Sequence, residues 1–253
     1  MDNMQKIPVF FTFDANYLLA AKVAIHSMMK HASRQYWYEL YVFHTTLSPK
    51  AQQSLRNSLK EFTHTELHFI DVTQYNEKIK NFGTKAHYSK EIFYKLIATD
   101  VLPQYDRIIC SDVDVVFTGD FSPVFFMFPN EKFYYAGVGP VENSRMPYYR
   151  KDFSTTEMEI LEHEIAAGFL LINLKELRND HKQEEIINFY VNNYPRLRLP
   201  EQDCIILTCW PYIKYLPIDY SLPISFYRLN MNQRDFYQGN TEFAGDKATA
   251  LAK

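Results

Sequence analysis

Two aspartates, Asp112 and Asp114, follow directly after an apolar run and are separated by one residue. The run, residues 107–111, has the apolar side chains typical of a buried strand. Side chains alternate between the faces of a strand, so residues two apart point the same way. Two carboxylates on one side offer the hard oxygen ligands that Mg²⁺ and Mn²⁺ prefer. The spacing therefore predicts a divalent metal site, and the natural ligand of such a site is a diphosphate.

Two other interpretations of the aspartate pair stay open. The aspartates can be solvated side chains in a turn at the end of a strand, with no ligand at all. The segment Ser111-Asp-Val-Asp-Val115 also resembles the first motif of haloacid-dehalogenase-type phosphatases, in which the first aspartate is a nucleophile and the second an acid/base. That motif normally lies on the first strand and needs a later acidic pair for Mg²⁺, whereas three predicted strands precede it here.

The first half of the chain alternates between predicted strands and helices. The predicted strands are residues 7–13, 38–44 and 67–72, and the predicted helices are residues 17–30, from Ser48-Pro49 to about 62, and 89–102. This order is typical of an α/β fold with a mostly parallel sheet and helices on both faces. In such sheets ligands bind beyond the carboxyl ends of the strands, where Asp112 and Asp114 lie.

The second half of the predicted architecture is less regular. Strands are expected at residues 133–138 and 168–174 and a helix at 175–194. A polar loop is expected at 73–88 and an irregular stretch at 139–163, and the Pro- and Tyr-rich segment after Pro200 shows no clear periodicity. No repeat or linker interrupts the pattern, so we expect a single domain over residues 1–253.

Composition and charge exclude several classes of function. With 47% hydrophobic residues, the 253-residue chain can bury a sizeable core. The net charge of −3 gives no reason to expect nucleic acid or an anionic membrane as the main partner. Three cysteines form no paired framework, which suits a reducing compartment. The sequence has neither a signal peptide nor an apolar stretch long enough to span a bilayer, so we expect a cytoplasmic protein.

Five segments, in this order, resemble family 8 glycosyltransferases, which include glycogenin-like enzymes and bacterial lipopolysaccharide galactosyl- and glucosyltransferases. They are Pro8-Val-Phe-Phe-Thr-Phe-Asp-Ala-Asn-Tyr17, Tyr94-Lys-Leu96, Ser111-Asp-Val-Asp-Val115, Ala167-Gly-Phe-Leu-Leu-Ile-Asn-Leu174 and Glu201-Gln-Asp203. The resemblance covers about residues 7–220. It implies the GT-A nucleotide-sugar-binding fold, a UDP-glucose or UDP-galactose donor bound with Mn²⁺ or Mg²⁺, and retention of anomeric configuration. Residues 7–116 would form the UDP-binding half, and residues 117–253 the half for donor sugar and acceptor.

The resemblance places the uridine at the first strand-to-helix turn. Thr12, Asp14, Asn16 and Tyr17 would hold it, with Asp14 bonding to the base and Tyr17 stacking on it. A carboxylate acceptor and an aromatic ring are also chemically suited to the edge and face of a uracil. Without the family, Tyr17 would be expected to pack on the first helix.

The resemblance places the diphosphate between the aspartate pair and a basic residue. Lys95 matches a family position that contacts the donor, although a lone lysine on a helix is more often a solvated surface residue. Asp112 and Asp114, with Val113 between them, become the metal-binding segment, and the ion would stabilise the UDP leaving group.

The sugar side of the site is implied by two further segments. Ala166, Ala167 and Gly168 would line the donor sugar. Glu201, Gln202 and Asp203 match an element beside that sugar, in which Gln202 lies under the anomeric carbon and Asp203 binds sugar hydroxyls. Gln202 and Asp203 are therefore the expected catalytic pair. From the residues alone, the acids after Pro200 can instead open a helix, where they favour the helix dipole.

Three departures from the family pattern affect these expectations. Ala166 replaces a usual Asn, which removes a polar contact to the donor sugar, and Glu201 replaces a usual Asp. The family's third metal ligand is a histidine near the carboxyl end, and no histidine occurs here after His181. Residues 243–253 read as the beginning of a helix, so we expect the natural protein to continue past Lys253 into that motif. Such a missing region could also contact a membrane at its inner face.

The acceptor is expected to be a hydroxyl of a glycan, a lipopolysaccharide or a protein-linked sugar. The region from Asn143 to His163 is an expected acceptor loop. The main alternative to a transferase is a non-catalytic nucleotide-sugar-binding partner of another transferase. The third class is the aspartyl-nucleophile phosphatase described above.

Overall fold

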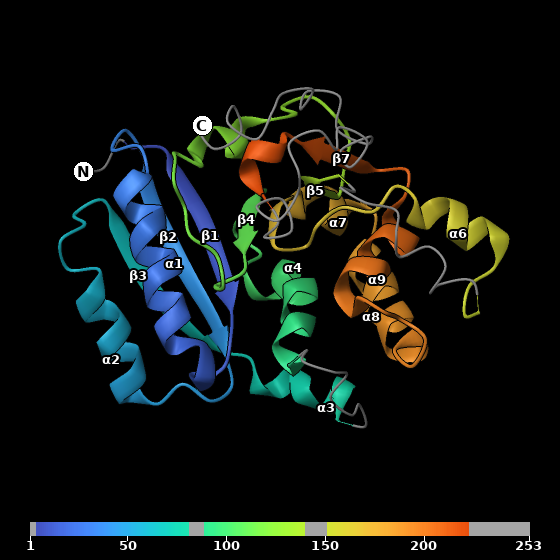
Figure 1. Cartoon of the computed structure of the whole chain (residues 1–253), viewed down its shortest axis with the longest axis horizontal. Coiled ribbons are helices and arrows are strands. Elements are labelled where there is room, and N and C mark those ends of the chain that lie inside the picture. The colour runs from blue at the N-terminus through green and yellow to red at the C-terminus, as the bar shows by residue number, and fades with distance from the viewer. Residues whose placement is uncertain (1–3, 81–88, 140–150, 223–253) are drawn as a thin grey trace, which may run out of the picture.

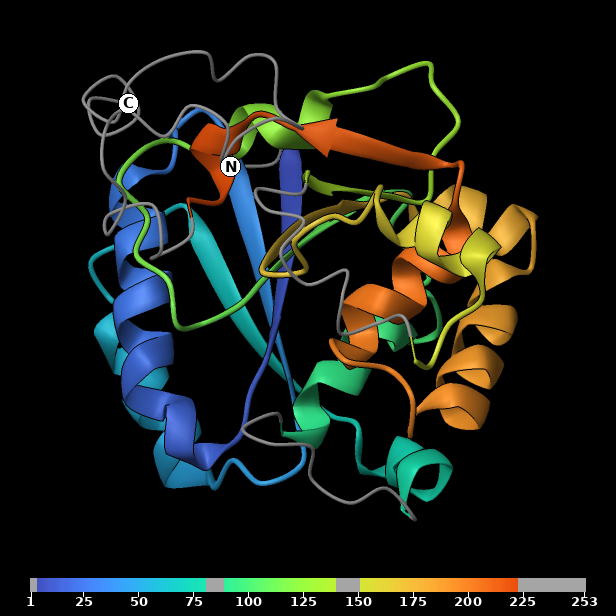
Figure 2. The same cartoon turned by 45° about the vertical axis from the view of Figure 1, so that its right-hand side comes forward.

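A computed structural model describes residues 4–80, 89–139 and 151–222 of the chain. Within these residues one sheet has seven strands in the order β3-β2-β1-β4-β6-β5-β7. The strands are β1 (Lys6–Thr12), β2 (Trp37–His44), β3 (Thr65–Asp71), β4 (Ile108–Ser111), β5 (Tyr135–Val138), β6 (Phe169–Ile172) and β7 (Ile213–Leu216). In Figure 2, β7 runs across the direction of β2 and β3, so the sheet is strongly twisted.

The direction of β6 determines what meets at one edge of the sheet. β1, β2, β3 and β4 pair in parallel, whereas β6 is antiparallel to both β4 and β5. The amino end of β6 therefore lies beside the carboxyl end of β4, where Ser111 faces Phe169. The pairing extends one residue further, because the Asp112 amide donates to the Gly168 carbonyl at 2.8 Å. The predicted metal-binding and sugar-binding segments are thereby brought together.

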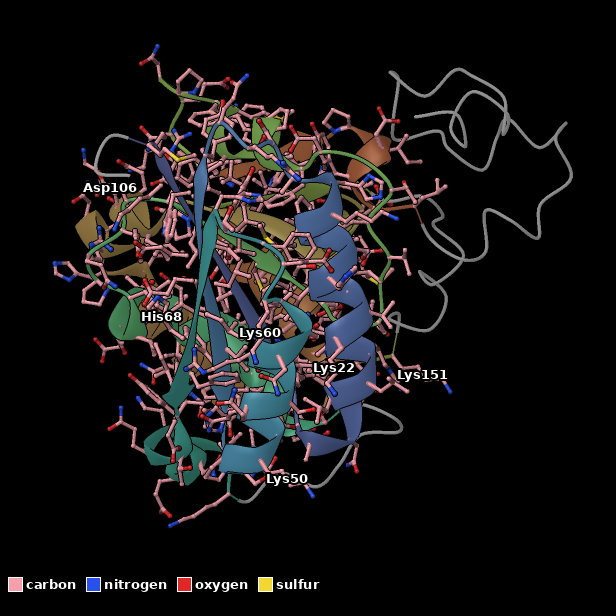
Figure 3. The ribbon with its side chains drawn as sticks, turned by 90° about the vertical axis from the view of Figure 1, so that its left-hand side faces the viewer. Lys22, Lys50, Lys60, His68, Asp106 and Lys151 are labelled. Atoms are coloured by element: carbon pink, nitrogen blue, oxygen red, sulfur yellow. The ribbon has the colours of Figure 1, made fainter. Side chains whose placement is uncertain are left out.

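Helices cover both faces of the sheet, as the alternating sequence pattern predicted. They are α1 (Leu18–His31), α2 (Pro49–Ser58), α3 (Asn76–Ile79), α4 (Ala98–Val101), α6 (Thr155–Leu161), α7 (Leu174–Asn179), α8 (Lys182–Asn193) and α9 (Pro200–Cys209). Figure 1 shows α1 and α2 on one side of β1–β3 and α4, α8 and α9 on the other. Figure 3 views the outer side of α1 and α2, with Lys22 on α1.

The core is divided between the two faces by simple alternation. In β1, Val9 and Phe11 pack with α1, whereas Phe10 packs in the second cluster with Phe93 and with residues of α8 and α9. Both sets are fully buried, as expected for parallel strands covered on both sides. Residues at the strand ends, such as Thr12 and Asp112, are therefore held by a rigid layer.

Several predicted elements differ from the structure. Residues 89–102 are helical, but the first part is the 3₁₀ helix η3 (Lys90–Ile97), followed by the single turn α4. The helix predicted at 175–194 is two helices, α7 and α8, because His181 has a left-handed backbone with φ of 52°. The polar loop predicted from residue 73 contains the 3₁₀ helix η2 (Thr73–Tyr75) and α3.

Two elements in the second half, α6 and β7, were not predicted, and α9 was expected only as an alternative for the acids after Pro200. The helix α6 begins with a capping box, in which Ser154 and Glu157 satisfy each other's backbone amides. The helix α9 buries nearly every residue, so it lacks the one-sided apolar pattern by which a surface helix is recognised. Strand β7 follows α9 and pairs in parallel with β5.

Some predictions lie outside the described residues. They are the loop at 81–88, the part of the acceptor loop at 143–150, and the helix beginning at 243–253. In the part of the chain that the structure describes, no helix has the length and apolar character needed to cross a membrane.

Candidate functional site

A buried lysine joins three segments at the edge of the sheet. The Lys95 ammonium, on η3, lies 2.7 Å from Asp112 Oδ1 and 3.1 Å from Glu201 Oε1. It also donates to the Ala167 carbonyl at 3.1 Å. Its side chain is only 2% exposed. The alternative of a solvated surface lysine is therefore wrong.

The charge state of Lys95 follows from these contacts. Burial alone would lower the pKa of its ammonium, but the carboxylates of Asp112 and Glu201 outweigh burial and raise that pKa above its ordinary value. The cation is thus retained at neutral pH. An ammonium has three N–H donors, and Asp112, Glu201 and Ala167 supply three acceptors. Lys95 therefore acts here on the carboxylates, and its direct contact with a donor diphosphate stays a prediction.

Gln202 is held by two opposite hydrogen bonds. Its Oε1 accepts from the Ala167 amide at 3.2 Å, and its Nε2 donates to Glu164 Oε2 at 2.9 Å. A backbone N–H can only donate and a carboxylate accepts, so the two partners fix which end of the amide is which. Ala167 thus bonds to Gln202 through its N–H and to Lys95 through its carbonyl.

Asp203 is bonded to the backbone at the start of α9. Its side chain is completely buried, and Oδ2 accepts from the amides of Arg198 at 2.6 Å and Leu199 at 3.0 Å. This carboxylate holds the chain that enters α9, whose first helical residue is Pro200. Asp203 Oδ2 thus binds the backbone of the two residues that precede α9, and its predicted contact with sugar hydroxyls stays a prediction. The alternative in which the acids open a helix correctly describes this segment.

Glu201 is also engaged within the protein. It lies in the first turn of α9, is buried, and forms an ion pair with Lys95. The longer arm of glutamate, compared with the aspartate usual in the family, reaches a cation of another element. The predicted contact of Glu201 with the donor sugar stays a prediction.

The predicted uridine segment follows the carboxyl end of β1. Asp14 is the N-cap of the 3₁₀ helix η1 (Ala15–Tyr17), and its side chain accepts from the amide of Asn16 at 2.8 Å. The side-chain amide of Asn16 donates to the second oxygen of Asp14 at 3.1 Å. Tyr17 is 41% exposed, so part of its side chain is accessible to a ligand. Thr12 is buried, and its hydroxyl donates to the Glu91 carbonyl at 2.7 Å, which fixes the strand end, and its predicted contact with the uridine stays a prediction.

The aspartate pair offers carboxylate oxygens in two environments. Asp112 is partly exposed and has one oxygen on Lys95, whereas Asp114 is exposed and the intervening Val113 is buried. This donor set, two carboxylates at a strand end, suits Mg²⁺ or Mn²⁺. Within residues 4–80, 89–139 and 151–222, however, no group of three His, Cys, Asp or Glu side chains is arranged to hold a metal ion. Metal binding by Asp112 and Asp114 stays a prediction.

The residues directly before β6 lie against the aspartate pair. A Cβ placed on Gly168 would lie 3.4 Å from Asp112 Oδ2, in van der Waals contact with that carboxylate. Ala166 is fixed by its amide, which donates to the Val138 carbonyl at 2.8 Å. Sequence reasoning missed Glu164, which binds Gln202. The available signal was a charged residue directly before the apolar stretch 165–172, because a carboxylate beside a buried strand needs donors.

Comparisons with known proteins identify the family and the fold. The sequence model described as Glycosyl transferase family 8 matches residues 8–243. No curated protein matches the chain. Among solved structures, the apo form of WbbM, a bifunctional glycosyltransferase, has a TM-score of 0.71 and 18% identity, with 95% of this chain and 46% of that chain covered.

Two other solved structures extend the comparison. The galactosyltransferase LgtC, in complex with donor and acceptor sugar analogs, has a TM-score of 0.70 and 17% identity, with 88% of this chain and 77% of that chain covered. The glycosyltransferase GlyE of Streptococcus pneumoniae TIGR4 has a TM-score of 0.65 and 17% identity, with 88% and 48% covered. The present chain spans about half the length of the WbbM and GlyE chains. At these identities the likeness establishes the fold, which is GT-A.

Proposed function

Because the chain belongs to glycosyltransferase family 8 and has the GT-A fold, we propose that it transfers glucose or galactose from a UDP-sugar to a carbohydrate hydroxyl with retention of configuration. The predicted resemblance to this family is thereby confirmed, and the phosphatase alternative is wrong. One observation carries the proposal: Lys95 joins Asp112 to Glu201, and the adjacent Gln202 bonds to the same residue, Ala167. Residues from four separate segments of the chain thus meet at one edge of the sheet.

The proposed reaction exchanges one bond at the sugar C1 for another. The bond from C1 to the β-phosphate oxygen breaks, and UDP leaves with the electron pair. The acceptor hydroxyl oxygen bonds to C1 and releases its proton. A divalent ion held by Asp112 and Asp114, Mn²⁺ or Mg²⁺, supplies positive charge for the diphosphate when bound.

The residues of the chain have separate tasks in this proposal. Tyr17 offers an exposed ring to the base, and Asp14 lies beside it at the same turn. Lys95 keeps Asp112 oriented, because its buried ammonium forms an ion pair with Oδ1 of that aspartate at 2.7 Å. Gln202 lies nearest to the sugar C1 and stabilises the positive charge that develops there as UDP leaves.

The acceptor class and location are part of the proposal. A glycan, a lipopolysaccharide or a protein-linked sugar supplies the hydroxyl, and the region from Asn143 to His163 is the proposed acceptor loop, of which the structure describes residues 151–163. We place the reaction in the cytoplasm, with peripheral contact at the inner face of a membrane when the acceptor is lipid-linked.

The second candidate function is a nucleotide-sugar-binding partner of another transferase, without turnover. Such a protein would bind UDP more weakly than an enzyme with a complete metal site.

A panel of UDP-sugars separates these two functions. The full chain is incubated with Mn²⁺ and each UDP-sugar, and release of UDP is followed with and without simple sugar acceptors. The proposal predicts UDP release with UDP-glucose or UDP-galactose that increases when an acceptor is added. Binding of UDP-sugars without any release would contradict the enzyme and support the binding partner.

A further inference from the structure

Glu164 is a buried acid whose carboxylate contacts the residue assigned to the sugar C1. Its side chain is on the short connection between α6 and β6 and is only 7% exposed. The carboxylate accepts from Gln202 Nε2 at 2.9 Å. Burying a carboxylate is costly compared with burying an amide or an apolar side chain of similar size. Glu164 thus offers Gln202 an acidic acceptor where a neutral residue would be less costly to bury.

The connection around Glu164 is fixed at both ends. The Glu164 amide donates to the Leu161 carbonyl at 3.2 Å, and the Ala166 amide donates to Val138 at 2.8 Å. Gln202 lies in the first turn of α9. The preceding residue, Glu201, forms an ion pair with Lys95. Both partners of the contact thus belong to well-anchored backbone.

A carboxylate changes the amide that it binds. The hydrogen bond from Nε2 to a charged acceptor is stronger than one to a neutral acceptor, and it polarises the amide toward Oε1. Oε1 of Gln202 accepts only one hydrogen bond among the described residues, from Ala167. An amide oxygen has a second lone pair, so a more negative Oε1 remains available to a ligand.

We propose that Glu164 is a positioning residue that fixes the orientation of the Gln202 amide and increases the electron density on its Oε1. Gln202 can then stabilise positive charge at the sugar C1 more strongly than an unassisted glutamine. The inference rests on the proposed function and deepens it. It also gives a polar group to the sugar side of a site in which Ala166 supplies none.

The test compares Glu164→Gln, Glu164→Ala and Gln202→Ala with the full chain of natural sequence. Glutamine at 164 keeps an acceptor for Nε2 and removes the charge, whereas alanine removes the acceptor. Glu162→Gln is the matched control, because Glu162 is exposed on the same connection. The measurements are kcat and KM for UDP-sugar breakdown with Mn²⁺, the Kd of UDP alone, and the thermal midpoint.

We expect Glu164→Gln to lower kcat about tenfold, with the KM, the Kd of UDP and the thermal midpoint nearly unchanged. Glu164→Ala should lower kcat further, and it should have no additional effect in a chain that already carries Gln202→Ala. If the role of Glu164 were purely structural, Glu164→Ala would lower the thermal midpoint. It would also still lower kcat in the chain that carries Gln202→Ala.

The outcomes separate this inference from the proposed function. Wild-type kcat in both Glu164 variants, together with intact UDP binding, would overturn the inference alone. An effect of Glu164→Ala that is undiminished beside Gln202→Ala would also overturn it. Failure of the unchanged chain to bind UDP would overturn the proposed function, and this inference with it.

Discussion

The ammonium of Lys95 lies 2.7 Å from Oδ1 of Asp112, so the first aspartate of the predicted metal pair is held by a buried cation from another element. Lys95 is on η3, whereas Asp112 follows β4. The same cation holds Glu201 at the start of α9. Folding of these three elements and orientation of the candidate site are therefore linked through a single nitrogen atom.

Removing this cation should destabilise the fold. Lys95→Met leaves Glu201 buried without its partner, and loss of one member of a buried pair costs about 3 kcal/mol of unfolding free energy. The measurement is urea unfolding at neutral pH. Lys80→Met is the matched control, because Lys80 forms an exposed ion pair with Glu77, and such pairs contribute at most about 1 kcal/mol. Equal stability losses in the two variants would contradict the role of Lys95.

The two aspartates should differ in their effect on stability. Asp112→Asn removes a charged partner of Lys95 and should lower the free energy of unfolding by about 1 to 3 kcal/mol. Asp114 is exposed, so Asp114→Asn should change it by less than about 0.5 kcal/mol. Urea unfolding without metal distinguishes them. Two equally mild variants would show that the Lys95 contact with Asp112 has little energetic effect.

The exposed ring of Tyr17 should contribute to nucleotide affinity. Stacking of a base on an aromatic side chain is worth about 1 to 3 kcal/mol, so Tyr17→Ala should weaken UDP binding about tenfold or more. Tyr212→Ala is a control of equal exposure, since both rings are 41% exposed. Calorimetric titration with UDP measures both variants. A similar loss of affinity in the two would argue against a base contact at Tyr17.

A carboxylate at the start of α6 should make stability depend on pH. The hydrogen bond from Arg196, assisted by the Ser154 cap, lowers the pKa of Glu157 from 4.5 to about 2. A folded-state pKa below the unfolded value gives stability that is present above about pH 4.5 and is lost as pH falls toward 2.

Glu157→Gln tests this pH dependence, because glutamine keeps the capping box and loses the charge. We expect the variant to be about 1 kcal/mol less stable at pH 7, and the difference to disappear as pH falls from 4.5 to 2. Urea unfolding across that range is the measurement. A difference that stays constant down to pH 2 would show that the charge of Glu157 is not its source.

The strands could be predicted because their sequence signal is local. β1, β2 and β4 are apolar runs, and their order along the chain implied a parallel sheet whose carboxyl ends lie together. Ser48 and Pro49 likewise predicted the start of α2, where the Ser48 hydroxyl accepts from the Ala51 amide at 3.2 Å. The helix α9 shows no helical periodicity because it is buried on nearly all sides, so only Pro200 and the acids after it indicated a helix.

Contacts within the candidate site join residues that are far apart in the sequence. The spacing of apolar residues along the chain does not predict such contacts. The resemblance brought Lys95, Asp112 and Gln202 into one site, but their partners come from residues far apart in the sequence. Lys95 and Glu201 are 106 residues apart, and Gln202 and Glu164 are 38 apart. The antiparallel direction of β6 places Ala167 beside the end of β4, where it bonds to both Lys95 and Gln202.

Binding of UDP by the aspartate pair is the central claim, and one calorimetric titration tests it most directly. UDP is titrated into the full chain with Mn²⁺, with a chelator in place of Mn²⁺, and into Asp114→Asn with Mn²⁺. The expected result is binding of UDP with Mn²⁺ that weakens at least tenfold in the other two titrations. Binding of equal strength in all three would contradict a metal-dependent site at Asp112 and Asp114.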